Sequence, residues 1–256
     1  MPDQRRCKGC ELIPPVLHLY VEIADDGFCM GHIPTLPGFC FRSQVDRDLE
    51  AEARLHLATY ARWLKDHDGA DLIPSTLQLT RNRPDALLVR EVEQVDGAPV
   101  WESGNAAALF SIDHQTMSDD AIRATFRFVR LVLDEIRVHA APLPSDQRVL
   151  RPTPERRSLN ETLEHIGNCI WWYASRIDDA LPEPPDVDGE DPLDRIDRLF
   201  DIVLSYMLSL PVSERARVHI PERYPTRDPS EPWTHAKVCR REAEHVWAHL
   251  GSLDKS

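Results

Sequence analysis

Long apolar runs are missing from this chain. No stretch approaches the ~20 apolar residues that a membrane-spanning helix needs. Arg5 and Arg6 lie near the N-terminus, but no apolar segment follows them, so the first residues do not have the pattern of a secretory signal. These absences predict a cytoplasmic protein with no membrane partner.

Positive charge is also scarce. The chain carries 30 basic and 43 acidic side chains, which gives a formal net charge of −13. Affinity for nucleic acid comes largely from neutralising phosphates, so we expect no nucleic-acid partner for an acidic chain that lacks a basic patch. The basic clusters are short: Arg5-Arg6, Arg156-Arg157 and Arg240-Arg241.

Several well-known catalytic and ligand-binding motifs are absent. The sequence has no Gly-x-Ser-x-Gly elbow and no glycine-rich phosphate loop. Cys7 and Cys10 form a lone C-x-x-C pair, whereas a zinc ribbon needs a second pair. A redox site would need the pair to open a helix, which Pro14 and Pro15 disfavour. We therefore expect no function for this pair, and thiols rather than disulfides in a reducing cytosol.

What is present fits a globular protein of two domains. The chain has 256 residues, of which 42% are hydrophobic and 29% charged, and this length exceeds the usual size of one domain. The sequence of residues 1–114 predicts an α+β domain that contains an antiparallel sheet and one helix. We expect this helix over 45–65, with Ser43 or Asp46 as its N-cap residue. Asp25-Asp26-Gly27 indicates a hairpin. The predicted strands are 16–23, 28–33, 39–42, 76–80, 87–95, 99–102 and 105–111.

Residues 115–256 predict an all-α domain instead. Apolar residues recur at helical spacing over 122–136, 159–177, 193–210 and 236–250. Each segment has one apolar stripe, as the core of a four-helix bundle requires. The connections over 141–153, 181–192 and 211–232 are long and rich in proline. Connections of that length allow crossovers, so the second and fourth helices can be neighbours.

Three histidines in these helices are candidate metal ligands. His245 and His249 are four residues apart, which stacks two imidazoles on one helix face. His165, in the second helix, would complete a three-nitrogen site. Three protein ligands leave a coordination position open, as in a catalytic rather than a structural metal site. The alternative for an H-x-x-x-H pair is two solvated histidines without a ligand.

Two segments of the C-terminal half resemble the DinB-like (YfiT-like) family of four-helix bundles. They are Leu159-Asn-Glu-Thr-Leu-Glu-His-Ile-Gly-Asn-Cys-Ile-Trp-Trp-Tyr173 and Arg241-Glu-Ala-Glu-His-Val-Trp-Ala-His-Leu250, similar to the family's L-x-H helix and its terminal E-H-x-x-x-H helix. The resemblance spans residues 115–254. It implies a divalent metal, often nickel or zinc, bound by His165, His245 and His249. Members with known activity include thiol-dependent S-transferases and a maleylpyruvate isomerase, which use a low-molecular-weight thiol.

The chain departs from this family pattern at three positions. Arg157 stands where Trp is frequent, and Val246 and Ala248 stand where Glu and His are frequent. The missing Glu removes a partner that could orient a ligand. The sequence-local candidates for that role are Glu164, Glu242 and Glu244.

The N-terminal half resembles HicB-like domains over residues 16–66. Tyr20-Val-Glu-Ile-Ala-Asp-Asp-Gly-Phe-Cys-Met-Gly-His-Ile-Pro-Thr-Leu-Pro-Gly38 is similar to their D-G…P-x-L-P-G strand pair, which a helix follows. HicB domains are best known as antitoxins that bind a small RNase toxin, but no attached DNA-binding segment is visible here. The resemblance implies a binding or dimerising module, and with it a possible homodimer.

Two neighbours of the histidines leave alternatives open. Cys169, one turn from His165, is either a fourth ligand that closes the site or, as is more frequent, a small core cysteine. Trp171, Trp172, Tyr173 and Trp247 either wall a pocket or pack in the core.

The resulting hypothesis is a metal-dependent thiol S-transferase or hydrolase that acts on a small molecule. Zinc or nickel suits a site that binds a thiolate better than magnesium does. The alternative is a non-catalytic protein in which a HicB-like interaction or antitoxin-type module is fused to an inactive bundle.

Overall fold

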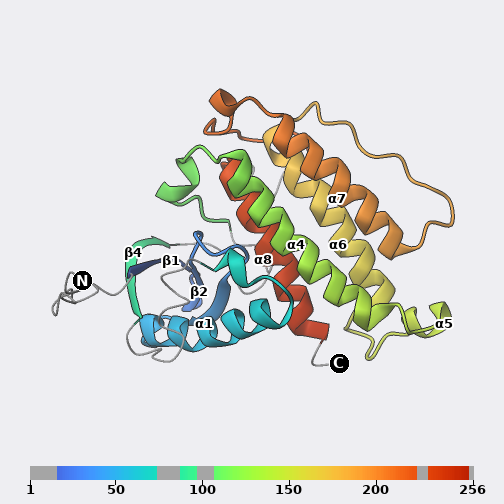
Figure 1. Ribbon diagram of the computed structural model, residues 1–256, viewed down its shortest axis with the longest axis horizontal. Coiled ribbons are helices and arrows are strands. Elements are labelled where there is room, and N and C mark those ends of the chain that lie inside the picture. The colour runs from blue at the N-terminus through green and yellow to red at the C-terminus, as the bar shows by residue number, and fades with distance from the viewer. Residues whose placement is uncertain (1–15, 74–86, 97–106, 224–229, 254–256) are drawn as a thin grey trace, which may run out of the picture.

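The protein has a mixed α/β fold. The computed structural model describes residues 16–73, 87–96, 107–223 and 230–253. A four-stranded sheet occupies the N-terminal part, and the C-terminal part consists mostly of helices, four of which are long and lie side by side (Figure 1). Among the described residues, no helix combines the length and the apolar content that crossing a bilayer requires.

The sheet contains β1 (Val16–Ile23), β2 (Phe28–His32), β3 (Cys40–Gln44) and β4 (Leu88–Asp96), in the order β3-β2-β1-β4. β1 and β2 form the predicted hairpin, with Gly27 at φ +83° in the turn. β1 pairs with β2 and β2 with β3 in antiparallel fashion, but β4 runs parallel to β1. The prediction of an antiparallel sheet is therefore wrong for one pair of strands.

The direction of β4 follows from the helix that precedes it. The helix α1 (Leu49–Asp66) follows β3 and contacts both β3 and β4. It carries the chain back to the end of the sheet where β1 and β3 begin, so the next strand runs in their direction. A helix between two strands of one sheet is the usual way to make a parallel pair.

Two details of the predicted α+β region are also corrected. Asp48, not Ser43 or Asp46, caps α1 and accepts a hydrogen bond from the backbone N of Ala51 at 3.0 Å. The described part of the predicted strand over 105–111 is not a strand, because the backbone N–H groups of Ala107 and Ala108 donate to the carboxylate of Glu22. The predicted strands over 76–80 and 99–102 lie outside the described residues.

The four predicted helical segments are all present. They are α4 (Asp119–Ala140), α6 (Leu159–Ala174), α7 (Pro192–Ser209) and α8 (His235–Leu253), and a short α5 (Ser145–Arg148) lies in the first connection. Ser118 caps α4, and Ser158 forms a capping box with Glu161 at the start of α6. α6 packs against α7 and α8, so the second and fourth helices are neighbours as expected.

Buried apolar side chains form one continuous cluster through most of the described structure. It includes Leu19 of the sheet and Val246 of α8, both with no exposed surface. The ring of Trp247 of α8 also contacts Tyr60 and Trp63 of α1, with centroids 5.8 and 4.9 Å apart. The core therefore continues across residues 114 and 115, and the division into two domains there stays a prediction.

A tight turn fixes the sheet against the long helices. Gly38 has φ +73°, and a Cβ atom there would lie 2.1 Å from the ring of Phe128 in α4. Only glycine combines this backbone conformation with such a close approach. The hydroxyl of Tyr60 donates to the carbonyl of the neighbouring Pro37 at 2.6 Å.

Buried charges join α8 to the sheet. Glu244 of α8 lies 2.6 Å from Nδ1 of His32 in β2 and 2.9 Å from Nη1 of Arg241. Arg240 contacts Asp113 at 2.7 Å. All five side chains are almost completely buried. Burial alone would raise the pKa of Glu244, but His32 and Arg240 lower it to about 2. The Arg240-Arg241 cluster is therefore internal and not a surface patch.

We expect Glu244→Gln to lower the free energy of unfolding by about 3–5 kcal/mol, because the substitution leaves buried cations without their anion. Urea denaturation followed by circular dichroism measures this loss. Glu164→Gln, which changes an exposed carboxylate on α6, is the matched control and should change stability by less than about 0.5 kcal/mol. An equal, small effect of both variants would show that the network does not stabilise the fold.

Candidate metal centre

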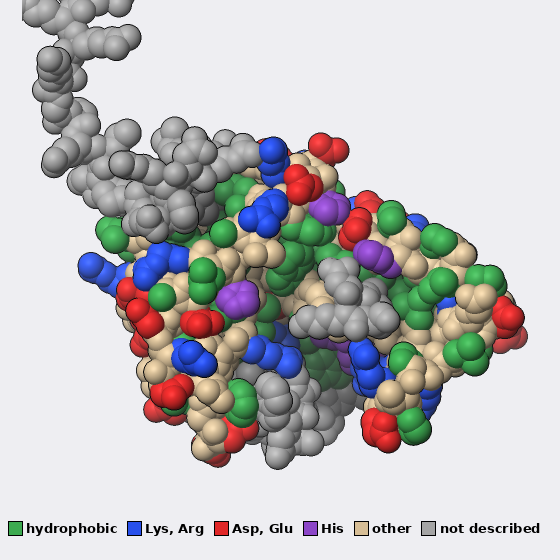
Figure 2. Space-filling view, turned by 90° about the horizontal axis from the view of Figure 1, so that it is seen from below, with side chains coloured by type: hydrophobic (Ala, Val, Ile, Leu, Met, Phe, Trp, Pro, Cys, Tyr) green, Lys and Arg blue, Asp and Glu red, His purple; other side chains and the backbone are tan. Residues whose placement is uncertain are grey.

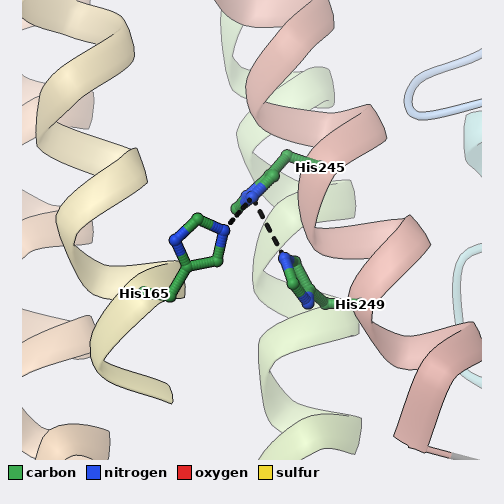
Figure 3. A group of neighbouring side chains, drawn as sticks. All are labelled: His165, His245 and His249. Carbon is green, nitrogen blue, oxygen red and sulfur yellow. Dashed lines mark hydrogen bonds between the residues drawn. The ribbon is translucent and has the colours of Figure 1, made fainter. Parts of the chain in front are cut away.

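The three candidate histidines come together between α6 and α8. His165 projects from α6 towards His245 and His249 of α8, and the three rings face one another (Figure 3). Nε2 of His245 lies 3.2 Å from Nε2 of His165 and 3.1 Å from Nε2 of His249. One nitrogen of each residue lies within 4.8 Å of the others.

Helix geometry explains this convergence. His245 and His249 are one turn apart on α8 and therefore project from one face. His165 is half-buried, whereas the next residue, Ile166, is completely buried. The histidines thus flank the core, as the spacing of the apolar residues predicts.

The distances suit a metal ion. With metal–nitrogen bonds of about 2.1 Å, two imidazole nitrogens on one ion lie about 3.0–3.4 Å apart, depending on the bond angle. The two Nε2–Nε2 distances of 3.1 and 3.2 Å fall in this range. In the chain alone these contacts are hydrogen bonds, in which one ring donates an N–H and the other accepts.

The three imidazoles are neutral near pH 7. Burial lowers the pKa of His165 and that of His249 to about 4, and it also lowers the pKa of His245 well below its usual value. The positive charge of Arg157 acts in the same direction on all three residues. Neutral imidazole is the form that binds metals, so these rings are ready to bind without losing a proton.

The three glutamates suggested as orienting partners have different surroundings. Glu164 is exposed, and Glu244 belongs to the buried network on another face of α8. Glu242 is completely buried, and neither of its carboxyl oxygens has a hydrogen-bond partner among the described residues. Burial raises the pKa of this carboxyl group well above its usual value, which favours its protonated form. Nδ1 of His245 is also buried without a partner in the described structure.

Cys169 lies beside the site but outside the converging group. Its Sγ atom is 3.6 Å from Nδ1 and 3.8 Å from Nε2 of His165. It does not belong to the set of donor atoms that are all within 4.8 Å of one another. Burial raises the pKa of this thiol to about 12, with a further contribution from Glu242. The position of Sγ outside the converging set of donor atoms therefore favours the core-cysteine interpretation.

The aromatic residues mostly pack in the core. Trp171 and Tyr173 are buried, and Trp247 contacts α1 as described above. Tyr173 also borders the site, since its ring centroid lies 5.6 Å from that of His245. Its hydroxyl accepts a hydrogen bond from Nη2 of Arg241 at 3.3 Å. This tyrosine therefore packs directly against the site.

The remaining candidates from the sequence lie apart from this site. His32 is buried in the ionic network, His18 is exposed, and the ring of His56 stacks on Phe41. None of the three belongs to a group of potential metal ligands in the described part of the chain. Cys7 and Cys10 lie outside the described residues.

Sequence reasoning did not assign a role at the site to two arginines. Arg157 precedes α6, and its charge acts on all three histidines. Arg42 belongs to β3, and its charge acts on His249. The position of Arg157 just before the helix of His165 was a usable signal, whereas Arg42 comes close only through the tertiary fold.

Comparison with family models, with curated proteins and with solved structures finds no match for this chain.

We expect Cys169→Ala to retain zinc with an affinity within about threefold of the wild type, because Sγ lies outside the set of converging donor atoms. Competition with a chromogenic chelator measures the affinity. His165→Ala, on the same helix, is the reference for a lost ligand and should lose at least about tenfold. A similar loss in Cys169→Ala would mean that the thiolate binds the ion and closes the site.

Proposed function

We propose that this protein is a divalent-metal-binding enzyme that acts on a small molecule, as a thiol S-transferase or a hydrolase. The supporting observation is the convergence of three imidazole Nε2 atoms from two helices. We further propose kinship with the DinB-like four-helix bundles, on the basis of the motifs around His165 and His245.

The chemistry of the donor set supports a metal site. Three partly buried, neutral rings are drawn together by Nε2 contacts, while Nδ1 of His245 has no acceptor among the described residues. A cation would satisfy the three lone pairs at once. Imidazole ligands and an incoming thiolate both suit zinc or nickel.

The residues around the histidines favour catalysis over a structural role. Three protein ligands leave room for a further ligand, and the three rings are only half-buried, so a small molecule can approach. A bound divalent ion would supply Lewis-acid chemistry towards a thiol or a water molecule. The buried ring of Tyr173 packs against His245, and burial raises the pKa of Glu242.

For the N-terminal part we propose a HicB-like α+β module that binds or dimerises. The order of three strands followed by a helix supports this proposal. The parallel pairing of β4 with β1 is an addition to the antiparallel sheet implied by the resemblance. The three histidines of the proposed metal site all come from α6 and α8, outside this module.

We expect His245→Ala to lose bound zinc or nickel while keeping the fold, because this ring contacts both of the other ligands. Elemental analysis of protein purified without a polyhistidine tag gives the metal content, and circular dichroism checks the fold. His114→Ala, which removes an exposed histidine at the end of the short 3₁₀ helix Ser111–His114, is the control. Unchanged metal content in folded His245→Ala would refute the proposed centre.

We also expect thiol transfer or hydrolysis to stop when a chelator removes the metal and to return when zinc or nickel is added. Conjugation of low-molecular-weight thiols to an electrophile, and hydrolysis of simple esters and amides, provide the assays. A metal-loaded protein that is inactive in all of them would favour the alternative of an interaction module fused to an inactive bundle.

A further inference from the structure

We infer that His32 forms a pH-dependent contact: its charged ring holds residues 107–113 against the sheet, and loss of the ring proton in alkaline solution releases them. Residues 107–113 are called the strap below. The inference concerns the buried ionic network between the sheet and α8, and it does not depend on the proposed metal centre.

The ring of His32 lies between two carboxylates and has no exposed surface. Its Nδ1 is 2.6 Å from Oε1 of Glu244 in α8, and its Nε2 faces Oε2 of Glu22 in β1 at 3.8 Å. A neutral imidazole has one N–H donor and one acceptor nitrogen, so it would turn a lone pair towards one of the two carboxylates. Only the imidazolium ion directs an N–H group at both.

The charges of the network balance only if this ring is positive. The network contains three carboxylates and two guanidinium groups, from Glu22, Asp113, Glu244, Arg240 and Arg241, and each of these residues is at most 7% exposed. Arg240 pairs with Asp113 at 2.7 Å, and Arg241 pairs with Glu244 at 2.9 Å. One negative charge is left over, and the imidazolium ring offsets it.

Burial makes this balance matter. On the face shown in Figure 2, basic and acidic side chains are interspersed at the surface, where water and salt screen them. The charges of the network have no such screening, and a buried charge without a partner is strongly destabilising. Loss of the proton from His32 therefore costs far more than the loss of a surface charge.

Neighbouring titratable groups do not supply the missing positive charge. Tyr20 and Cys40 lie opposite His32 on the two adjacent strands. A phenol and a thiol can gain only negative charge, and burial raises the pKa of both groups. Lys237 and Glu231 form a separate buried pair at 2.9 Å.

The surroundings of His32 also set the direction of the pH dependence. Burial alone would lower the pKa of His32, but the charge of Glu244 and the contacts with both glutamates raise it above its usual value. With a pKa raised in the folded state, the stabilisation is complete below the pKa of the unfolded chain and is lost as the pH rises through the folded pKa. The contact therefore weakens in alkaline solution.

The strap depends on this contact through Glu22. Oε1 of Glu22 accepts hydrogen bonds from the backbone N–H groups of Ala107 and Ala108 at 2.6 and 3.0 Å. The ring of Phe110 packs on His32, with centroids 5.3 Å apart. Oε2 of Glu22 has no hydrogen-bond partner within the described ranges, so without the charged ring it loses the cation that it faces. Glu22 then draws in water, and the strap opens on the side of the sheet.

NMR titration of the ring nitrogens of His32 in the full-length protein tests the charge directly. The ¹⁵N chemical shifts distinguish an imidazolium ion from a neutral imidazole. We expect His32 to keep both ring protons at about pH 8, where an ordinary histidine is neutral.

Hydrogen–deuterium exchange then measures whether the strap follows the ring. After correction for the intrinsic pH dependence of exchange, the protection of the amides of Ala107 and Ala108 should fall by up to about tenfold for each pH unit above the midpoint of the ring titration. In His32→Gln the charge is absent at every pH, so the protection should be low and independent of pH. His18→Gln changes an exposed histidine of β1 and is the matched control, which should behave as the wild type.

Three results would overturn the inference. They are a singly protonated ring of His32 at pH 7 in the folded protein, protection of the strap that does not change with pH in the wild type, and the same pH dependence in His32→Gln as in the wild type. If His32→Gln does not fold, the two measurements on the wild type decide alone, since neither needs a variant.

Discussion

The carboxylate of Glu244 is the constraint on which the arrangement of this molecule depends. It lies among His32, Arg240 and Arg241, with almost no contact with water. Charged groups without water are tolerated only when their partners are held in place, so α8 has one position relative to the sheet. The same helix carries His245 and His249. The ionic contacts on one face of α8 therefore set where the imidazoles on another face lie.

Two faces of α8 have different electrostatic surroundings. On the side of the sheet, cations and anions are matched and buried. On the side of α6, three histidine rings meet. The first arrangement stabilises the protein without needing a ligand. On the second side, Nδ1 of His245 and the carboxyl oxygens of Glu242 are buried without partners in the described structure, as expected where a ligand binds.

Local patterns predicted much of this structure. Apolar periodicity located the long helices, and the four-residue spacing of His245 and His249 placed both rings on one face. The predictions that proved wrong were those that depended on partners distant in the sequence. The carboxylate of Glu22 accepts hydrogen bonds from the backbone N–H groups of Ala107 and Ala108, where a strand was predicted. The helix α1 carries the chain back before β4, so β4 pairs with β1 in parallel. Glu242 and Glu244 are only two residues apart, yet burial raises the pKa of Glu242, whereas the pKa of Glu244 is lowered by the charges of His32 and Arg240.

The burial of His32 also bears on the order in which the protein is made. His32 leaves the ribosome 212 residues before Glu244 does. Until then, the ring of His32 lacks its carboxylate partner from α8. Docking of α8 supplies this partner and brings His245 and His249 into place. Completion of the buried ionic network and convergence of the three histidines thus depend on the same late step in folding.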